Sequence, residues 1–346
     1  MVLSNTASTT PFPSSSSQAT PEQTLHAYIE RSFLRFMQVG NNYLIFNCIS
    51  FFIVLLEIVA LLFLIAYLPH SSALAVTISL LFTTGFAYTI LRLYFHTKQP
   101  EQYHLIRQHF IYECKELLLY DEHNPSSLHT LANALCQHAA TLQGQEYHFY
   151  TLPSSIKQIQ PLAEKFSCWW HWKEVIQMQE HILDYAIHER IQRVKLEPTN
   201  FEAHAALANT YLLLSDIYYI PEKDEEHRWT PHEKNSRDLK NKFSLAAHQA
   251  IEELKILNEY SPNDLWVHKQ LAHTYHKFKM YEEEMQEYET IISLAHDDYE
   301  AMYQLGVLYF QHGKNGKGLK IYDTLCHKKQ SKAEQLIKFY GTGDPI

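Results

Sequence analysis

The sequence predicts an all-α fold in which a two-helix transmembrane hairpin precedes a stack of helical repeats. Two apolar runs, residues 43–68 and 72–95, are each long enough to cross a bilayer as a helix, which takes roughly 20 residues. The C-terminal half repeats a pattern of apolar residues at a spacing of about 34 residues. The chain also has only 9 glycines beside 23 tyrosines and 22 histidines, a composition that favours packed helices over a turn-rich β fold.

Two segments precede the apolar runs. Residues 1–23 are dominated by Ser, Thr and Pro without apolar periodicity, so we expect a disordered tail there; a secretion or targeting leader is the alternative. Residues 24–42 carry Leu25, Ile29 and Phe36 at helical spacing. This spacing predicts a short amphipathic helix that lies on the membrane surface.

The link between the two apolar runs is only three residues long, which forces an antiparallel hairpin. We expect Pro69 to end the first helix and Ser71 or Ser72 to cap the second. Lysine and arginine residues flank both outer ends of the hairpin, whereas the link has none. The positive-inside rule therefore predicts two spans with both termini on the cytoplasmic side.

Glu57 is the acidic residue of the first apolar run. Thr83 follows His70, the centre of the link, by as many residues as Glu57 precedes it, so an antiparallel pair places Glu57 level with Thr83, Thr84 and Gly85. The threonine hydroxyls can hydrogen-bond the carboxyl group, and a glycine allows helices to approach closely. We therefore expect an intramembrane contact, either within the pair or with a second copy in a homo-oligomer. The alternative is a subunit of a transport or channel complex that uses Glu57.

Residues 299–332 carry the clearest repeat. Its small and apolar positions are Ala301, Leu305, Gly306, Tyr309, Gly318 and Tyr322. This segment resembles a tetratricopeptide repeat, a pair of antiparallel helices that stacks on its neighbours. The resemblance extends to units that begin at Leu265 and at Phe201, and it implies an α-solenoid.

The resemblance divides the rest of the chain. Tetratricopeptide-like repeats are expected over residues 201–340, with a charged insert at about 217–246 and a last helix, "SKAEQLIKFYG", that caps the stack. Residues 97–200 keep helical periodicity with weaker matches, so we expect divergent helical repeats there, and residues 341–346 are a tail. The "WWHW" sequence at 169–172 cannot place all three indole rings on one helix face. At least one is expected to be buried and another exposed, in a partner contact or on lipid headgroups.

Such solenoids bind protein segments along a concave face lined by the first helix of each repeat. The resemblance places eight residues in this groove: Asn209, Leu212, Trp266, Lys269, His273, His276, Tyr303 and Phe310. The alternative for Trp266 and Phe310 is packing against neighbouring repeats. The positions at which family members hold a chaperone's carboxylate lack Lys and Arg here, so that ligand is not expected.

Catalysis, cofactors and metal ions are not expected. The sequence contains no HExxH, GxSxG or phosphate-binding glycine loop, and the five cysteines form no CxxC pair. His273 and His276 share a helix face without an acid or Cys at ligand spacing. A net charge of −9 also argues against binding nucleic acid, which needs a basic face.

The order of the segments carries a second resemblance. A Ser/Thr-rich tail, a hairpin with a minimal link and a large helical domain resemble the layout of chlamydial inclusion-membrane proteins. This resemblance implies a secreted protein of an inclusion membrane that engages host proteins. The more general hypothesis is a scaffold or adaptor anchored in the lipid bilayer of a bacterial inner membrane, which binds protein partners through its helical groove on the cytosolic side.

Overall fold

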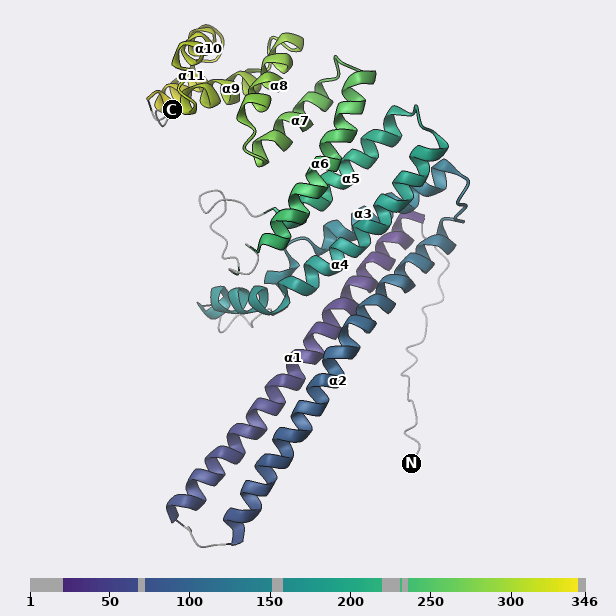
Figure 1. The fold of residues 1–346 in the computed structure, drawn as a ribbon, viewed down its shortest axis with the longest axis vertical. Helices are drawn as coiled ribbons and strands as arrows, with labels where there is room; N and C mark the ends of the chain where they lie inside the picture. Colours follow the sequence, from purple (N-terminus) through teal and green to yellow (C-terminus); the bar gives the residue numbers. More distant parts are fainter. Residues whose placement is uncertain (1–20, 68–71, 151–157, 220–230, 232–235, 342–346) are drawn as a thin grey trace.

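The computed structural model describes residues 21–67, 72–150, 158–219, 231 and 236–341, and these residues contain helices and no strand. The prediction of an all-α fold is confirmed. Two long helices, α1 (Pro21–Tyr67) and α2 (Ser72–Leu117), lie side by side in opposite directions, and their lower halves extend away from every other helix (Figure 1). Residues 1–20 of the tail expected at 1–23 lie outside the described residues. The link with Pro69 and Ser71 lies outside them as well.

The remaining helices form antiparallel pairs that stack in chain order (Figure 1). Their bounds are α3 (Pro125–Leu142), α4 (Gln160–Leu196), α5 (Phe201–Tyr218), α6 (Arg237–Tyr260), α7 (Leu265–Lys277), α8 (Tyr281–Leu294), α9 (Tyr299–Gln311), α10 (Asn315–Lys328) and α11 (Gln330–Leu336). A short 3-10 helix, η1 (Gln145–Tyr147), precedes α4, and another, η4 (Ile337–Phe339), follows α11. The pairs are α3/α4, α5/α6, α7/α8 and α9/α10.

The first helix of each pair begins with the same capping device. The residue before the helix is Asn124, Asn200, Asp264 or Asp298, and in each case its side chain accepts a hydrogen bond from a backbone N–H of the first turn. Such caps satisfy amides that have no partner inside the helix. They fix where each pair starts, and α5, α7 and α9 begin at the residues where the sequence placed the repeats.

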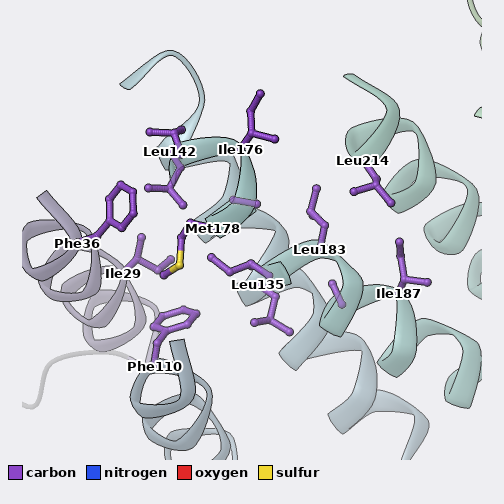
Figure 2. Packing of buried hydrophobic residues seen from close by; sticks show 14 of the residues in the cluster. Ile29, Phe36, Phe110, Leu135, Leu142, Ile176, Met178, Leu183, Ile187 and Leu214 are labelled. Atoms are coloured by element: carbon purple, nitrogen blue, oxygen red, sulfur yellow. The ribbon is translucent and has the colours of Figure 1, made fainter. Parts of the chain in front are cut away.

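The core joins the inner ends of the long helices to the first pair. Ile29 and Phe36 of α1 and Phe110 of α2 are buried together with Leu135 of α3 and Met178 of α4 (Figure 2). The expectation of a separate amphipathic helix on the membrane surface is therefore wrong, because residues 24–42 belong to an unbroken α1 whose apolar face is covered by protein. The stack likewise does not begin at residue 97, since α2 continues through Leu117.

The insert between the helices of the second pair is shorter than expected. α5 continues to Tyr218 and α6 begins at Arg237, with Ser236 as its cap, so residues 237–246 are helical rather than part of an excursion. Leu239 and Ala246 are buried, which explains why these turns are ordered against the core. At the other end of the stack, a Cβ on Gly306 would lie 2.7 Å from Leu336 Cδ2, so α11 closes tightly over α9.

Candidate functional site

The exposed sides of the first helices form what we call the first-helix face. Of the eight residues that the sequence placed there, Asn209, Trp266, Lys269, His273 and His276 are exposed and Tyr303 is half-buried.

Two of the expected groove residues belong to the core instead. Phe310 is 0% exposed and Leu212 is 8% exposed. Phe310 lies directly over Gly318 of α10, where an added Cβ would come within 2.5 Å of its ring. Both positions are buried, so their placement in the exposed groove is wrong. Phe310 packs on α10 of its own pair and shares a buried cluster with Leu336 of α11, whereas Trp266 stays 38% exposed.

Ion pairs connect successive helices along the first-helix face. One pair bridges each step of the stack: Arg193–Glu202, Asp216–Lys277, Lys269–Asp298 and Glu300–Lys332. They join α4 to α5, α5 to α7, α7 to the N-cap of α9 and α9 to α11. Exposed pairs of this kind contribute little stability, typically less than about 1 kcal/mol each. Their effect is to make the face a continuous polar surface with alternating charge.

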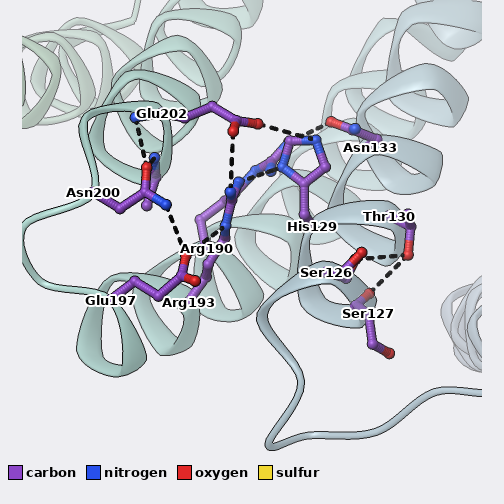
Figure 3. Close-up of polar contacts among 11 residues, drawn as sticks. Ser126, Ser127, His129, Thr130, Asn133, Arg190, Arg193, Glu197, Asn200 and Glu202 are labelled. Atoms are coloured by element: carbon purple, nitrogen blue, oxygen red, sulfur yellow. Dashed lines mark hydrogen bonds and ion pairs between the residues drawn. The ribbon is translucent and has the colours of Figure 1, made fainter.

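The densest cluster of charges lies at the α3 end of this face (Figure 3). Arg190 and Arg193 of α4 are both buried, and both guanidinium groups approach Nδ1 of His129. Arg190 also donates to Asn133, and Arg193 lies 3.4 Å from Glu202. Burial and then the two arginines lower the pKa of His129, so the ring is neutral at pH 7 and accepts from the guanidinium groups. Sequence reasoning missed this cluster because it lies in the weakly matching segment before Phe201.

The same histidine contact occurs in the second pair, α5/α6, and in the third pair, α7/α8. In each case it joins the two helices of the pair. His204 Nδ1 lies 2.7 Å from Glu253 Oε2 and its Nε2 lies 3.0 Å from the Pro198 carbonyl oxygen. His268 repeats both contacts, at 2.6 Å with Glu287 and 2.9 Å with the carbonyl of Pro262. The signal in the sequence is a proline followed six residues later by histidine, at both 198–204 and 262–268. These histidines join two helices and a loop.

Glu57 lies inside the hairpin, 6% exposed. Thr84 Oγ1 donates to its Oε1 at 2.7 Å, whereas its Oε2 is buried without a hydrogen-bond partner among the described residues. Thr83 bonds the Ser79 carbonyl of its own helix. Gly85 does not mediate a close helix contact, because a Cβ there would meet nothing within 4 Å; that expectation is wrong.

An apolar pocket lies on the hairpin surface beside this carboxyl group. It is lined by Ile49, Phe52, Ile53, Leu56, Glu57 and Leu80. Its walls come from both helices and are almost entirely hydrocarbon, so the pocket suits an apolar group such as a lipid chain or a neighbouring helix.

A polar network ties α4 to α2 at the base of the hairpin. Glu174 accepts from Gln99 Nε2 at 2.6 Å and from the Tyr103 hydroxyl at 3.2 Å, both on α2. His171 Nδ1 lies 2.8 Å from the same carboxylate, and the hydroxyl of Tyr150 lies 2.5 Å from its Nε2. Burial, and then the Glu174 charge, raise the pKa of Tyr103 far above its usual range, so the phenol stays a donor. The network fixes the height of α4 on the hairpin.

No protein-family model matches the chain, and no curated protein matches it either. Among the described residues, no three His, Cys, Asp or Glu side chains gather in a way that could hold a metal ion. The first-helix face and the apolar surface of the hairpin are therefore the two candidate functional surfaces.

Proposed function

We propose that the protein is a membrane-anchored scaffold that holds a protein-binding stack of helix pairs at the surface of a bilayer. The observation that carries the proposal is the bare apolar surface of the hairpin. Large apolar side chains are exposed around both helices, among them Phe52 at 65% and Phe82 at 76%. Both helices are long and apolar enough to cross a membrane. A continuous apolar surface of this extent requires a non-aqueous environment.

The geometry of the hairpin supports a single-sided topology. The outer ends of α1 and α2 lie together, next to the stack (Figure 1). Arg31, Arg35 and Lys98 flank this end of the hairpin. By the positive-inside rule, this distribution of charge supports a cytosolic position for both termini and the repeats.

The first-helix face is the proposed partner surface. It combines an exposed indole, Trp266, with exposed histidines and alternating charges, and aromatic residues with polar neighbours are typical of protein-binding surfaces. The resemblance to tetratricopeptide repeats, whose partners are protein segments, supports the same surface. Glu57 is proposed to act as a contact within the hairpin, because Thr84 of the other helix donates a hydrogen bond to its Oε1.

The membrane part is tested with the full chain in its native cell type. Extraction at alkaline pH followed by flotation should leave the chain with the lipid fraction. Protease added to sealed vesicles should remove N-terminal and C-terminal tags together, from the same side. A chain released by alkali, or tags cleaved from opposite sides, would contradict the proposal.

The binding part is tested by photo-crosslinking from single positions in the living cell. A photoreactive residue at Trp266 or Asn209, on the first-helix face, should form discrete protein adducts. The control is Tyr260, an aromatic position at the end of α6 that is more exposed than Trp266, at 61% against 38%. Adducts that form from Tyr260 but not from Trp266 or Asn209 would move the partner surface away from the first-helix face.

A further inference from the structure

The first turns of α4 carry an apolar stripe that no other part of the described chain covers. Ile159, Leu162, Phe166 and Trp169 recur every three or four residues, so they share one side of the helix. Leu162 is 66% exposed and Trp169 is 52% exposed. From Cys168 onward the opposite side of α4 enters the core. The stripe is therefore a second exposed apolar surface, separate from the hairpin in sequence.

The aromatic residues of the stripe touch one another. The Phe166 ring centroid lies 6.1 Å from that of Trp169 and 6.0 Å from that of Trp170, and the two indoles are 5.7 Å apart. Tyr150 adds a ring 5.9 Å from Phe166. Trp172, by contrast, is buried. Aromatic rings with one apolar side and one polar group are the residues that accumulate where lipid headgroups meet hydrocarbon.

The polar network at His171 holds the stripe close to the end of the hairpin's apolar runs, at Tyr43 and Phe95. Phe149 stacks on His171 with ring centroids 3.9 Å apart, and a Cβ on Gly40 would lie 2.9 Å from the Phe149 ring. Gly40 precedes Tyr43, the first residue of the apolar run, by about 4.5 Å along the helix. Tyr43 faces Phe95, at the other end of the run, with ring centroids 6.4 Å apart. Figure 1 shows the N-terminal end of α4 extending sideways from the hairpin, as the lowest part of the helices outside it.

The charges beside the stripe fit the same location. Lys165 and Lys173 are exposed on the same stretch of α4. Lysine side chains near a bilayer extend toward the phosphate groups, and each contributes about 1 kcal/mol of attraction to an anionic surface.

We propose that this stripe, residues 159–169, lies in the headgroup region of the same bilayer that the hairpin crosses. A helix that lies in the interface buries its apolar side by roughly 5–10 Å. The occupant of the stripe is thus phospholipid, and its role is to fix the stack against the membrane surface at a second point. The proposal rests on insertion of the hairpin.

The test uses the full chain in vesicles of phosphatidylcholine and phosphatidylglycerol whose acyl chains are brominated near the headgroup. Bromine quenches tryptophan emission on contact, so the wild-type emission should fall relative to vesicles without bromine. The quenched part should be largely lost in Trp169→Phe and unchanged in Trp266→Phe, the matched control on α7. Water-soluble acrylamide should reach Trp169 less in vesicles than in the unfolded chain.

Three results would overturn the proposal. One is wild-type emission that bromine leaves unchanged, and another is equal quenching in Trp169→Phe and the wild type. The third is full access of acrylamide to Trp169 in vesicles, which would show that the stripe lies in water. Flotation of the same vesicles separates the two proposals, because a chain that floats with an unquenched Trp169 keeps its anchor and loses only the second contact.

Discussion

The hairpin and the repeats are both built from paired helices, yet they distribute their side chains in opposite ways. In the hairpin, phenylalanines such as Phe52 and Phe82 point outward while the carboxyl group of Glu57 lies inside. In the repeats, Leu131 and Leu254 are completely buried while ion pairs cover the outside. Backbone hydrogen bonding is the same in both regions. The hairpin thus exposes the kind of side chain that the repeats bury, as expected if the proposed bilayer surrounds the hairpin and water surrounds the repeats.

The largest expected effect comes from the core of the repeats. Phe310→Ala should destabilise the stack by about 3–5 kcal/mol, because it removes a buried ring and leaves a cavity over Gly318. Urea unfolding followed by circular dichroism measures the shift of the midpoint. The matched change in the hairpin, Phe82→Ala, should leave that midpoint in place, since Phe82 is 76% exposed. Equal losses in both variants would break the comparison.

A smaller effect is expected from pH. Burial lowers the pKa of His138 to about 4, and its Nε2 lies 3.0 Å from Ser32 Oγ of α1. A histidine with a lowered folded-state pKa favours folding above its unfolded pKa of about 6.5, and this stability is lost as the pH falls toward 4. Titration of His138 should therefore lower the free energy of unfolding by about 2 kcal/mol between pH 7 and pH 5.

The measurement compares urea midpoints of the wild type and His138→Gln at both pH values. The variant should lose less stability on acidification than the wild type. An identical pH dependence in both proteins would show that His138 titrates normally and that the contact between α1 and α3 is not acid-sensitive.

A helix cap of the repeats comes next in size. Asp264→Ala should lower the free energy of unfolding by about 1 kcal/mol, because the Asp264 carboxylate accepts a hydrogen bond from the amide of Trp266 at 2.8 Å. The neighbouring exposed residue makes the control, and Asn263→Ala should change the urea midpoint little. If the two substitutions cost the same, the cap does not define the start of α7.

The smallest effect is expected inside the hairpin. A double-mutant cycle with Glu57→Leu and Thr84→Val should give a coupling of about 0.6 kcal/mol, the average for hydrogen bonds between membrane helices. Unfolding in detergent micelles measures it. The same cycle with Thr83→Val should give no coupling, because Thr83 bonds its own helix. Glu57→Leu should still float with lipid, and loss of an ion flux in that variant would revive a transport role.

The sequence predicted best what depends on local pattern. The two long apolar helices and the starts of the first helices at Phe201, Leu265 and Tyr299 follow from spacing within one or two turns of helix. The burial of the Phe310 side chain could not be predicted from the sequence, because it depends on how closely α10 approaches α9 at Gly318. A helical pattern gives the period of a stripe, and only the packed neighbour decides which side of the stripe is covered.

Contacts between distant segments were likewise hidden. Residues 24–42 have the composition of a surface helix, and only the fold shows that Phe36 meets Tyr103, with ring centroids 4.9 Å apart. Arg190 and His129 come from helices whose sequences match the repeat weakly. The histidine contacts at His204 and His268 were visible as a repeated proline-to-histidine spacing, which a comparison of the two units position by position would have found.

The unbroken course of α1 has a mechanical consequence. The helix that lies in the hairpin is the same helix that enters the core at Phe36, and no turn or loop interrupts it between Pro21 and Tyr67. A bilayer accommodates long helices by tilting them, and the tilt depends on its thickness. In a membrane, α1 and α2 therefore act as a lever with its pivot in the lipid. The thickness of the bilayer sets the angle of the lever, and the outermost repeats, α9 to α11, travel farthest.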